Sequence, residues 1–212
     1  MQMRSFLSLV PLALLAAAGG PARAESTYGY NTAGTGNVSA TARLTINIVV
    51  PKVVVLRVGS AGAGVDTLVY NARVSIPATP TNVDGATPGT AADAAPVVWD
   101  GTAPTTTVPG LATRSAAAFV WTNGSGVSVK CVATSFDPGG PTLANIAAAA
   151  GTGDTFSHPA ANLAGCDGTP SPNLTANTLY SGTWTYTLDS SNANTWKAGA
   201  YSTTVTYTAA GT

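Results

Sequence analysis

The sequence predicts an all-β fold. Short segments in which apolar and polar residues alternate follow one another along the chain, Gly, Pro, Asn and Asp separate them at near-regular intervals, and no segment has the period of an amphipathic helix. About eight or nine such strands indicate an antiparallel β-sandwich of immunoglobulin-like architecture. A closed β-barrel is the alternative arrangement.

The first residues have the pattern of a secretory signal peptide. Arg4 gives a positive start, residues 6–18 form an apolar run, and Ala22-Arg23-Ala24 is a small-x-small cleavage site. We therefore expect residues 1–24 to be removed during export, to the periplasm, the cell surface or the medium. No second apolar stretch long enough to span a membrane follows. Residues 25–37 read as a flexible leader, and residues 38–212 as a single domain.

Residues 38–50 carry a long alternating pattern, with apolar side chains at every second position from Val38 to Val50. This pattern predicts an amphipathic strand. Pro51 interrupts it, because proline cannot donate a hydrogen bond within a sheet. The next run, residues 53–58, is apolar on both faces except for Arg57, and predicts a strand buried in the core.

Residues 68–76 alternate again and predict a further strand. The amino-acid composition then changes, because residues 77–114 are rich in Pro, Thr and Ala and poor in large apolar groups. We expect an elaborated loop there, in which residues 97–99 could form a short strand. A solvated insertion is the favoured interpretation, with a binding loop as the alternative.

Two hairpins are predicted in the second half of the chain. In the first, residues 115–122 with Ala117, Phe119 and Trp121 on one face lead through Asn123-Gly124 to a return strand over residues 127–133. Residues 143–150 predict a weak strand, and residues 151–176 mostly loop. In the second hairpin, residues 178–188 and residues 201–207 alternate, joined by a polar turn after Leu188.

The charged residues and the cysteines limit which ligands the protein can be expected to bind. Only 8% of residues are charged, and nine basic residues balance nine acidic ones, so no basic face for nucleic acid is expected. Cys131 and Cys166 are the two cysteines, and in an oxidising compartment we expect them to form one disulfide. A redox or metal pair is the alternative, but it would need closer spacing or histidine ligands. We expect no metal site and no cofactor.

No segment predicts catalysis. His158 is the only histidine, it lies in a predicted loop, and no G-x-S-x-G motif accompanies it, so a Ser-His-Asp hydrolase is the least favoured function. Aromatic side chains could instead stack on sugars. Most aromatics fall at strand positions where a role in the core or on a sheet face is expected, which leaves Trp99 and Trp196, in predicted loops, as candidate ligand contacts.

Two stretches resemble known families. The run AGAYSTTVTYTA, residues 198–209, resembles the last strand of secreted bacterial β-sandwich subunits of the spore-coat-U-like and chaperone–usher pilin classes. The alternating strand before Val50-Pro51-Lys52 is similar to the first strand of cell-wall WxL-type domains. The pilin resemblance implies assembly by strand exchange, in which residues 38–50 of one subunit complete the sheet of the next. Pilins of this kind usually place a cysteine early, whereas both cysteines here lie in the second half.

Together these observations predict an exported, non-enzymatic structural subunit of a surface or extracellular assembly, with a fimbria as one such assembly. Its expected partners are identical or related subunits bound through residues 38–50. Pairing of that strand within its own domain is slightly favoured over this assembly. A secreted carbohydrate- or ligand-binding module is the alternative function.

Overall fold

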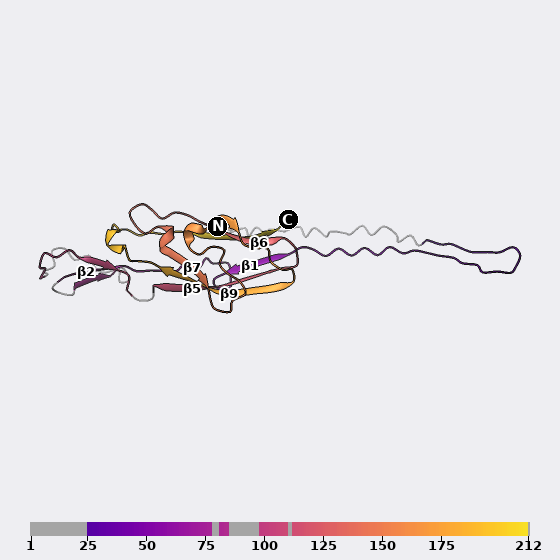
Figure 1. Ribbon diagram of the computed structural model, residues 1–212, viewed down its shortest axis with the longest axis horizontal. Helices are drawn as coiled ribbons and strands as arrows, with labels where there is room; N and C mark the ends of the chain where they lie inside the picture. The colour runs from indigo at the N-terminus through magenta and orange to yellow at the C-terminus, as the bar shows by residue number, and fades with distance from the viewer. Residues whose placement is uncertain (1–24, 78–80, 85–97, 110–111, 212) are drawn as a thin grey trace, which may run out of the picture. The chain divides into compact units, whose positions relative to one another are not determined.

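The computed structural model describes residues 25–77, 81–84, 98–109 and 112–211 (Figure 1). The predicted signal peptide, residues 1–24, lies outside the described residues, as does much of the loop predicted over residues 77–114. The chain divides into two units, Met1–Val50 and Pro51–Thr212. Within the described part of the chain, no helix is long and apolar enough to cross a membrane.

The second unit contains a four-stranded antiparallel sheet. Its strands are β1 (Val54–Val58), β5 (Thr113–Thr122), β9 (Thr178–Leu188) and β7 (Ile146–Ala150), in the order β1-β5-β9-β7. We call it the large sheet. It is built on β5 and β9, which pair over ten residues each. Threonines and aromatic residues alternate along β9, which suits a strand with one buried face.

Two three-stranded sheets complete this unit. One contains β10 (Val205–Gly211), β6 (Val127–Ala133) and β8 (Asp167–Pro170), in the order β10-β6-β8. The other contains β3 (Thr81–Asp84), β2 (Arg73–Ile76) and β4 (Thr105–Thr107), in the order β3-β2-β4, and Figure 1 shows β2 at one end of the unit, away from β1 and β6. Three short 3-10 helices, Leu143–Asn145, Leu163–Gly165 and Ala193–Thr195, lie between strands.

The large sheet and the β10-β6-β8 sheet share one hydrophobic core. Its fully buried members include Val120 from β5, Val129 from β6 and Trp184 from β9. Tyr207 and Ala209 of β10 pack against the same cluster. The prediction of an all-β fold is therefore confirmed.

The prediction of two hairpins is wrong, although most of the strands are real. β9 and β10 lie in different sheets, and so do β5 and β6. After β5 the chain crosses to the other sheet instead of folding back, since the Asn123 side chain accepts a hydrogen bond from the Val53 amide at 2.7 Å and donates one to the Pro51 carbonyl at 2.7 Å. The period of a strand sets which side chains share a face, but it does not select the neighbouring strand.

Residues 38–50 form no strand, so the expected pairing of this segment within its own domain is wrong. The segment is extended and exposed, with Leu44 at 71%, Ile46 at 76% and Ile48 at 82% exposure. Its contacts within the first unit are sparse. The Thr27 hydroxyl donates to the Thr41 carbonyl, and the Arg43 amide donates to the Glu25 carboxylate.

Four other segments differ in part from the predictions. The strand at residues 53–58 was expected in the core, but β1 is an edge strand in which Val54 is 42% and Val55 57% exposed. Only residues 73–76 of the strand predicted over residues 68–76 pair, and the predicted 77–114 loop contains β3, β4 and the start of β5. Residues 143–150 do contain a strand, β7. The loop predicted over residues 151–176 contains β8.

Candidate functional site

The disulfide predicted between Cys131 and Cys166 is present. Cys131 lies in β6, and Cys166 follows the 3-10 helix Leu163–Gly165 directly before β8. Both are almost fully buried, with 1% and 4% of their surface exposed. The bond closes a loop with a sequence separation of 35 residues and fastens the segment before β8 to the central strand of its sheet.

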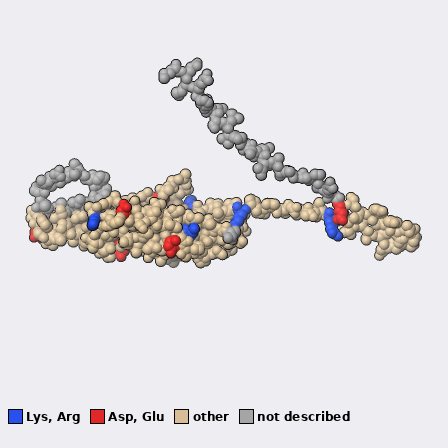
Figure 2. Space-filling view, turned by 90° about the horizontal axis from the view of Figure 1, so that it is seen from above, with Lys and Arg blue, Asp and Glu red and all other residues tan. Residues whose placement is uncertain are grey.

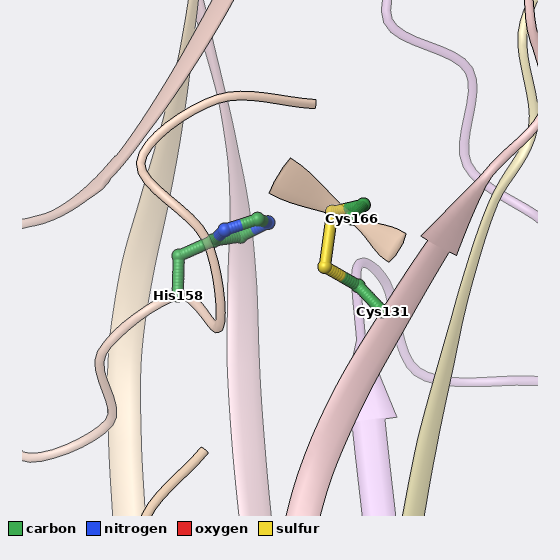
Figure 3. Close-up of side chains that lie close together, drawn as sticks. All are labelled: Cys131, His158 and Cys166. Atoms are coloured by element: carbon green, nitrogen blue, oxygen red, sulfur yellow. A yellow bond between two sulfur atoms is a disulfide. The ribbon is translucent and has the colours of Figure 1, made fainter. Parts of the chain in front are cut away.

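His158 lies beside this disulfide, a position that the sequence does not reveal. Figure 3 shows its ring directed toward the two sulfur atoms, and the three potential ligand atoms lie within 4.8 Å of one another. Nδ1 of the ring is 2.6 Å from the Ala160 carbonyl oxygen, and Nε2 is 2.8 Å from the Tyr207 hydroxyl. The Tyr207 hydroxyl is in turn 2.8 Å from that of Tyr186. These contacts form a partly buried polar chain, His158–Tyr207–Tyr186.

Burial sets the ionisation of this chain. It lowers the pKa of His158 below its ordinary value, while the hydrogen bond to Ala160 opposes the shift. Burial likewise raises the pKa of Tyr207 and of Tyr186, and the proximity of Tyr186 raises that of Tyr207 further. All three groups are therefore neutral at neutral pH. A neutral His158 ring can donate with one nitrogen and accept with the other, which matches its two contacts.

The chemistry of this cluster favours a structural role. Sulfur atoms joined in a disulfide are not thiolates, and the thiolate is the form of cysteine that binds metal or acts as a nucleophile. The two ring nitrogens of His158 face Ala160 and Tyr207, whereas a hydrolytic triad requires a serine on one nitrogen and a carboxylate on the other. The cluster can hold the two sheets in register, and it presents no nucleophile.

Trp184 joins the cluster from the large sheet. It is fully buried, and its Nε1–H donates to the Phe156 carbonyl at 2.8 Å. Its ring lies 4.8 Å from that of Phe156, 4.9 Å from that of His158 and 5.1 Å from that of Tyr207, centroid to centroid. The loop around residues 154–158 thus contacts both β9, through Phe156 and Trp184, and β10, through His158 and Tyr207.

The two tryptophans predicted as ligand contacts occupy different environments. Trp99 is 55% exposed, and its Nε1–H donates to the Thr102 carbonyl. Trp196 is half-buried against the core, and its Nε1 is buried without a hydrogen-bond partner. The two rings make no aromatic contact with each other in the described part of the chain.

Phe119 and Trp121, which the sequence places on one face of their strand, lie on the outer face of the large sheet. Ala118, Val120 and Thr122 are the residues of β5 that point into the core, whereas Phe119 and Trp121 point away and stay partly exposed. The Arg57 guanidinium lies 4.2 Å from the centre of the Phe119 ring. The two faces of β5 are almost equally apolar, so its alternation leaves the inward face undecided.

β1 and β10 are edge strands that can accept another strand, whereas the edge strand β7 cannot. β7 is covered on its outer side, since the Ala148 amide donates to the Ala161 carbonyl. β1 pairs on one side with β5, and β10 pairs on one side with β6. No hydrogen bond reaches the other side of either strand from the described residues. β1 and β10 lie near each other at the same side of the two sheets.

Charged side chains are sparse on this unit. Figure 2 shows Lys, Arg, Asp and Glu scattered singly over the visible face, with no broad patch of one sign.

In comparisons with protein families, with curated proteins and with solved structures, the chain finds no match.

Proposed function

We propose that this protein is an exported, non-enzymatic structural subunit that assembles with identical or related subunits by strand exchange. One observation carries the proposal. Residues 38–50 alternate as a strand does, yet they lie exposed and form no strand in the described chain. A segment that exposes Leu44, Ile46 and Ile48 on one face is stabilised when that face is covered.

The strand order supports an immunoglobulin-like sandwich as the acceptor. In that fold, strands A, B, E and D form one sheet in this order, and strands G, F and C form the other. The order β1-β5-β9-β7 matches A-B-E-D, and β10-β6 matches F-C. The position of strand G is the outer side of β10, where the described residues place no strand. A donor strand there would pair with β10 beside β1.

The side chains around that position favour an apolar donor. Leu56 and Val58 of β1 and Val205 and Tyr207 of β10 pack against the core but stay partly exposed. An inserted strand would cover them with every second residue of the donor and would satisfy the free backbone groups of the edge. Thirteen extended residues, 38–50, span about 43 Å, whereas the seven of β10 span about 24 Å, so the donor can cover the whole edge.

The magnitude of the effect is adequate for assembly. Burying one Leu or Ile side chain contributes about 1.5–3 kcal/mol, so Leu44, Ile46 and Ile48 together contribute about 5–9 kcal/mol before the cost of ordering the segment. The disulfide is consistent with an oxidising compartment, as export requires.

Neighbouring substitutions on opposite faces of the donor test the proposal. Ile46→Asp places a charge on the apolar face, and Thr45→Asp places the same charge on the polar face as a matched control. The molar mass in solution and the amount in sheared surface fractions are measured for each protein. We expect assemblies from the wild type and from Thr45→Asp, and monomer from Ile46→Asp. A wild type recovered only as periplasmic monomer would contradict the proposal.

A further inference from the structure

The outer face of the large sheet carries a small apolar platform. In one row across the sheet, Val55 of β1, Trp121 of β5 and Leu179 of β9 lie opposite one another. In the next outward row, Arg57 lies opposite Phe119. We call these five residues the outer-face platform. Val55 is 57% and Leu179 61% exposed, and neither aromatic ring packs against the core.

We propose that the outer-face platform binds a polysaccharide, with a sugar ring stacked on Trp121. A pyranose ring presents C–H groups on its faces and hydroxyl groups around its rim. The C–H faces pack on an aromatic ring and on the neighbouring Val55 and Leu179 side chains, as apolar groups do. The platform would act as an attachment site on the assembled subunit, and this inference does not rest on strand exchange.

Arg57 adds hydrogen-bond donors at the rim of the platform. Its guanidinium lies over the Phe119 ring, 4.2 Å from the centroid, and this cation–π contact orients the group. A guanidinium carries five N–H donors in one plane. Sugar hydroxyl and ring oxygens accept such bonds, so Arg57 can fix the position of a sugar whose ring lies on Trp121.

The same face continues from the platform into hydroxyl groups. Along β9, Thr183, Thr185 and Thr187 follow on the outer side, and the Thr187 hydroxyl is 3.0 Å from that of Thr113 on β5. Hydroxyls both donate and accept, as the hydroxyls of a sugar do. A chain of sugars leaving the platform along the sheet would meet a surface of matching polarity. The described outward rows of β1, β5 and β9 contain no Asp or Glu.

The size of the platform favours a glycan over a protein. Its longer row crosses three strands, about 10 Å, and the two rows lie about 7 Å apart. A stable protein interface buries about 1,200–2,000 Å² in total, far more than two rows of side chains supply. A short stretch of polysaccharide needs no more than this, and its hydroxyls can use the threonines beyond.

Binding to a defined set of polysaccharides tests the inference. The purified full-length protein is mixed with insoluble cellulose and chitin, and it is run through gels containing β-glucan or alginate. The variants are Trp121→Ala, Leu179→Ser and, as a control, Tyr28→Ala, which removes an exposed aromatic ring outside the outer-face platform. Circular dichroism confirms folding, and Leu179→Ser serves if Trp121→Ala does not fold.

We expect the wild type and Tyr28→Ala to bind at least one of the four polysaccharides with equal affinity, and a platform variant to bind at least about tenfold more weakly. Three results would overturn the inference. The wild type binds none of the four, a folded platform variant binds as the wild type does, or Trp121→Ala changes the molar mass of the protein without any glycan. The last result would make the face a contact between protein chains.

Discussion

Reduction of the Cys131–Cys166 disulfide should lower the stability of the second unit substantially. The bond closes a loop of 35 residues, and the entropy that such a crosslink removes from the unfolded chain corresponds to about 4 kcal/mol at 25 °C. Both sulfurs remain buried in the core after reduction, so this comparison changes the unfolded state more than the packing. Stability is measured by guanidinium denaturation with and without reductant. The denaturant slope should rise on reduction, because the uncrosslinked unfolded chain exposes more surface.

The double variant Cys131→Ala/Cys166→Ala is the control for effects of the reductant itself. Its free energy of unfolding should not change when reductant is added, and it should lie at or below that of the reduced wild type, since the smaller side chains leave a gap in the core. If oxidised and reduced wild type unfolded within about 1 kcal/mol of each other, the assignment of the disulfide as a main stabilising element would be refuted.

Two further predictions concern the buried cluster next to the disulfide. Because burial lowers the pKa of His158 in the folded state, the unfolded chain binds the proton more tightly, and the free energy of unfolding should fall as the pH drops below about 6.5. His158→Gln should reduce this pH dependence, measured by urea denaturation from pH 4 to 8. If the free energy of unfolding of His158→Gln varied with pH as that of the wild type does, His158 would not be the group responsible. Trp184→Phe removes the hydrogen bond to the Phe156 carbonyl and part of a fully buried ring, and should cost about 2–4 kcal/mol in thermal or urea unfolding. Trp99→Phe, at an exposed site, should change stability by less than about 0.5 kcal/mol, and equal losses for the two variants would contradict the core assignment.

Local patterns in the sequence predict much of the fold. Alternation over residues 178–188 identifies β9 with its bounds, and the isolated cysteine pair predicts the disulfide that the structure contains. The strand prediction depends only on residues within one short segment. The disulfide prediction offers each cysteine only one possible partner. The partner of each strand depends on contacts between distant segments, and so the expected β5–β6 and β9–β10 hairpins are wrong.

The positions of the site residues also depend on contacts between distant segments, which local patterns do not predict. His158 follows no periodic pattern, and its place beside the disulfide results from a loop folding across the core. Phe119 and Trp121 alternate with Ala118 and Val120, and either set could fill a core. The inward choice of the smaller set is explained by two large rings that already fill the core beside β5, Trp184 of the neighbouring strand β9 and Tyr207 of the opposite sheet.

The proposed assembly gives residues 38–50 a role that their exposure alone leaves unexplained. An alternating apolar segment of this length exposed to water favours aggregation unless it has a specific acceptor. The outer edges of β1 and β10, which lie beside each other, offer such an acceptor on a second copy. The buried cluster and the disulfide then serve to keep the two sheets in position, so that the edge stays open for a donor.

Hydrogen–deuterium exchange of Val205–Gly211 tests this central claim most directly. In assembled wild-type protein, the β10 amides that do not pair with β6 should bond to the donor strand and exchange slowly. In Ile46→Asp the same amides should exchange rapidly, while those of β9 stay protected in both proteins, and Thr45→Asp should resemble the wild type. Equal exchange of β10 in the wild type and in Ile46→Asp would contradict strand exchange at this edge.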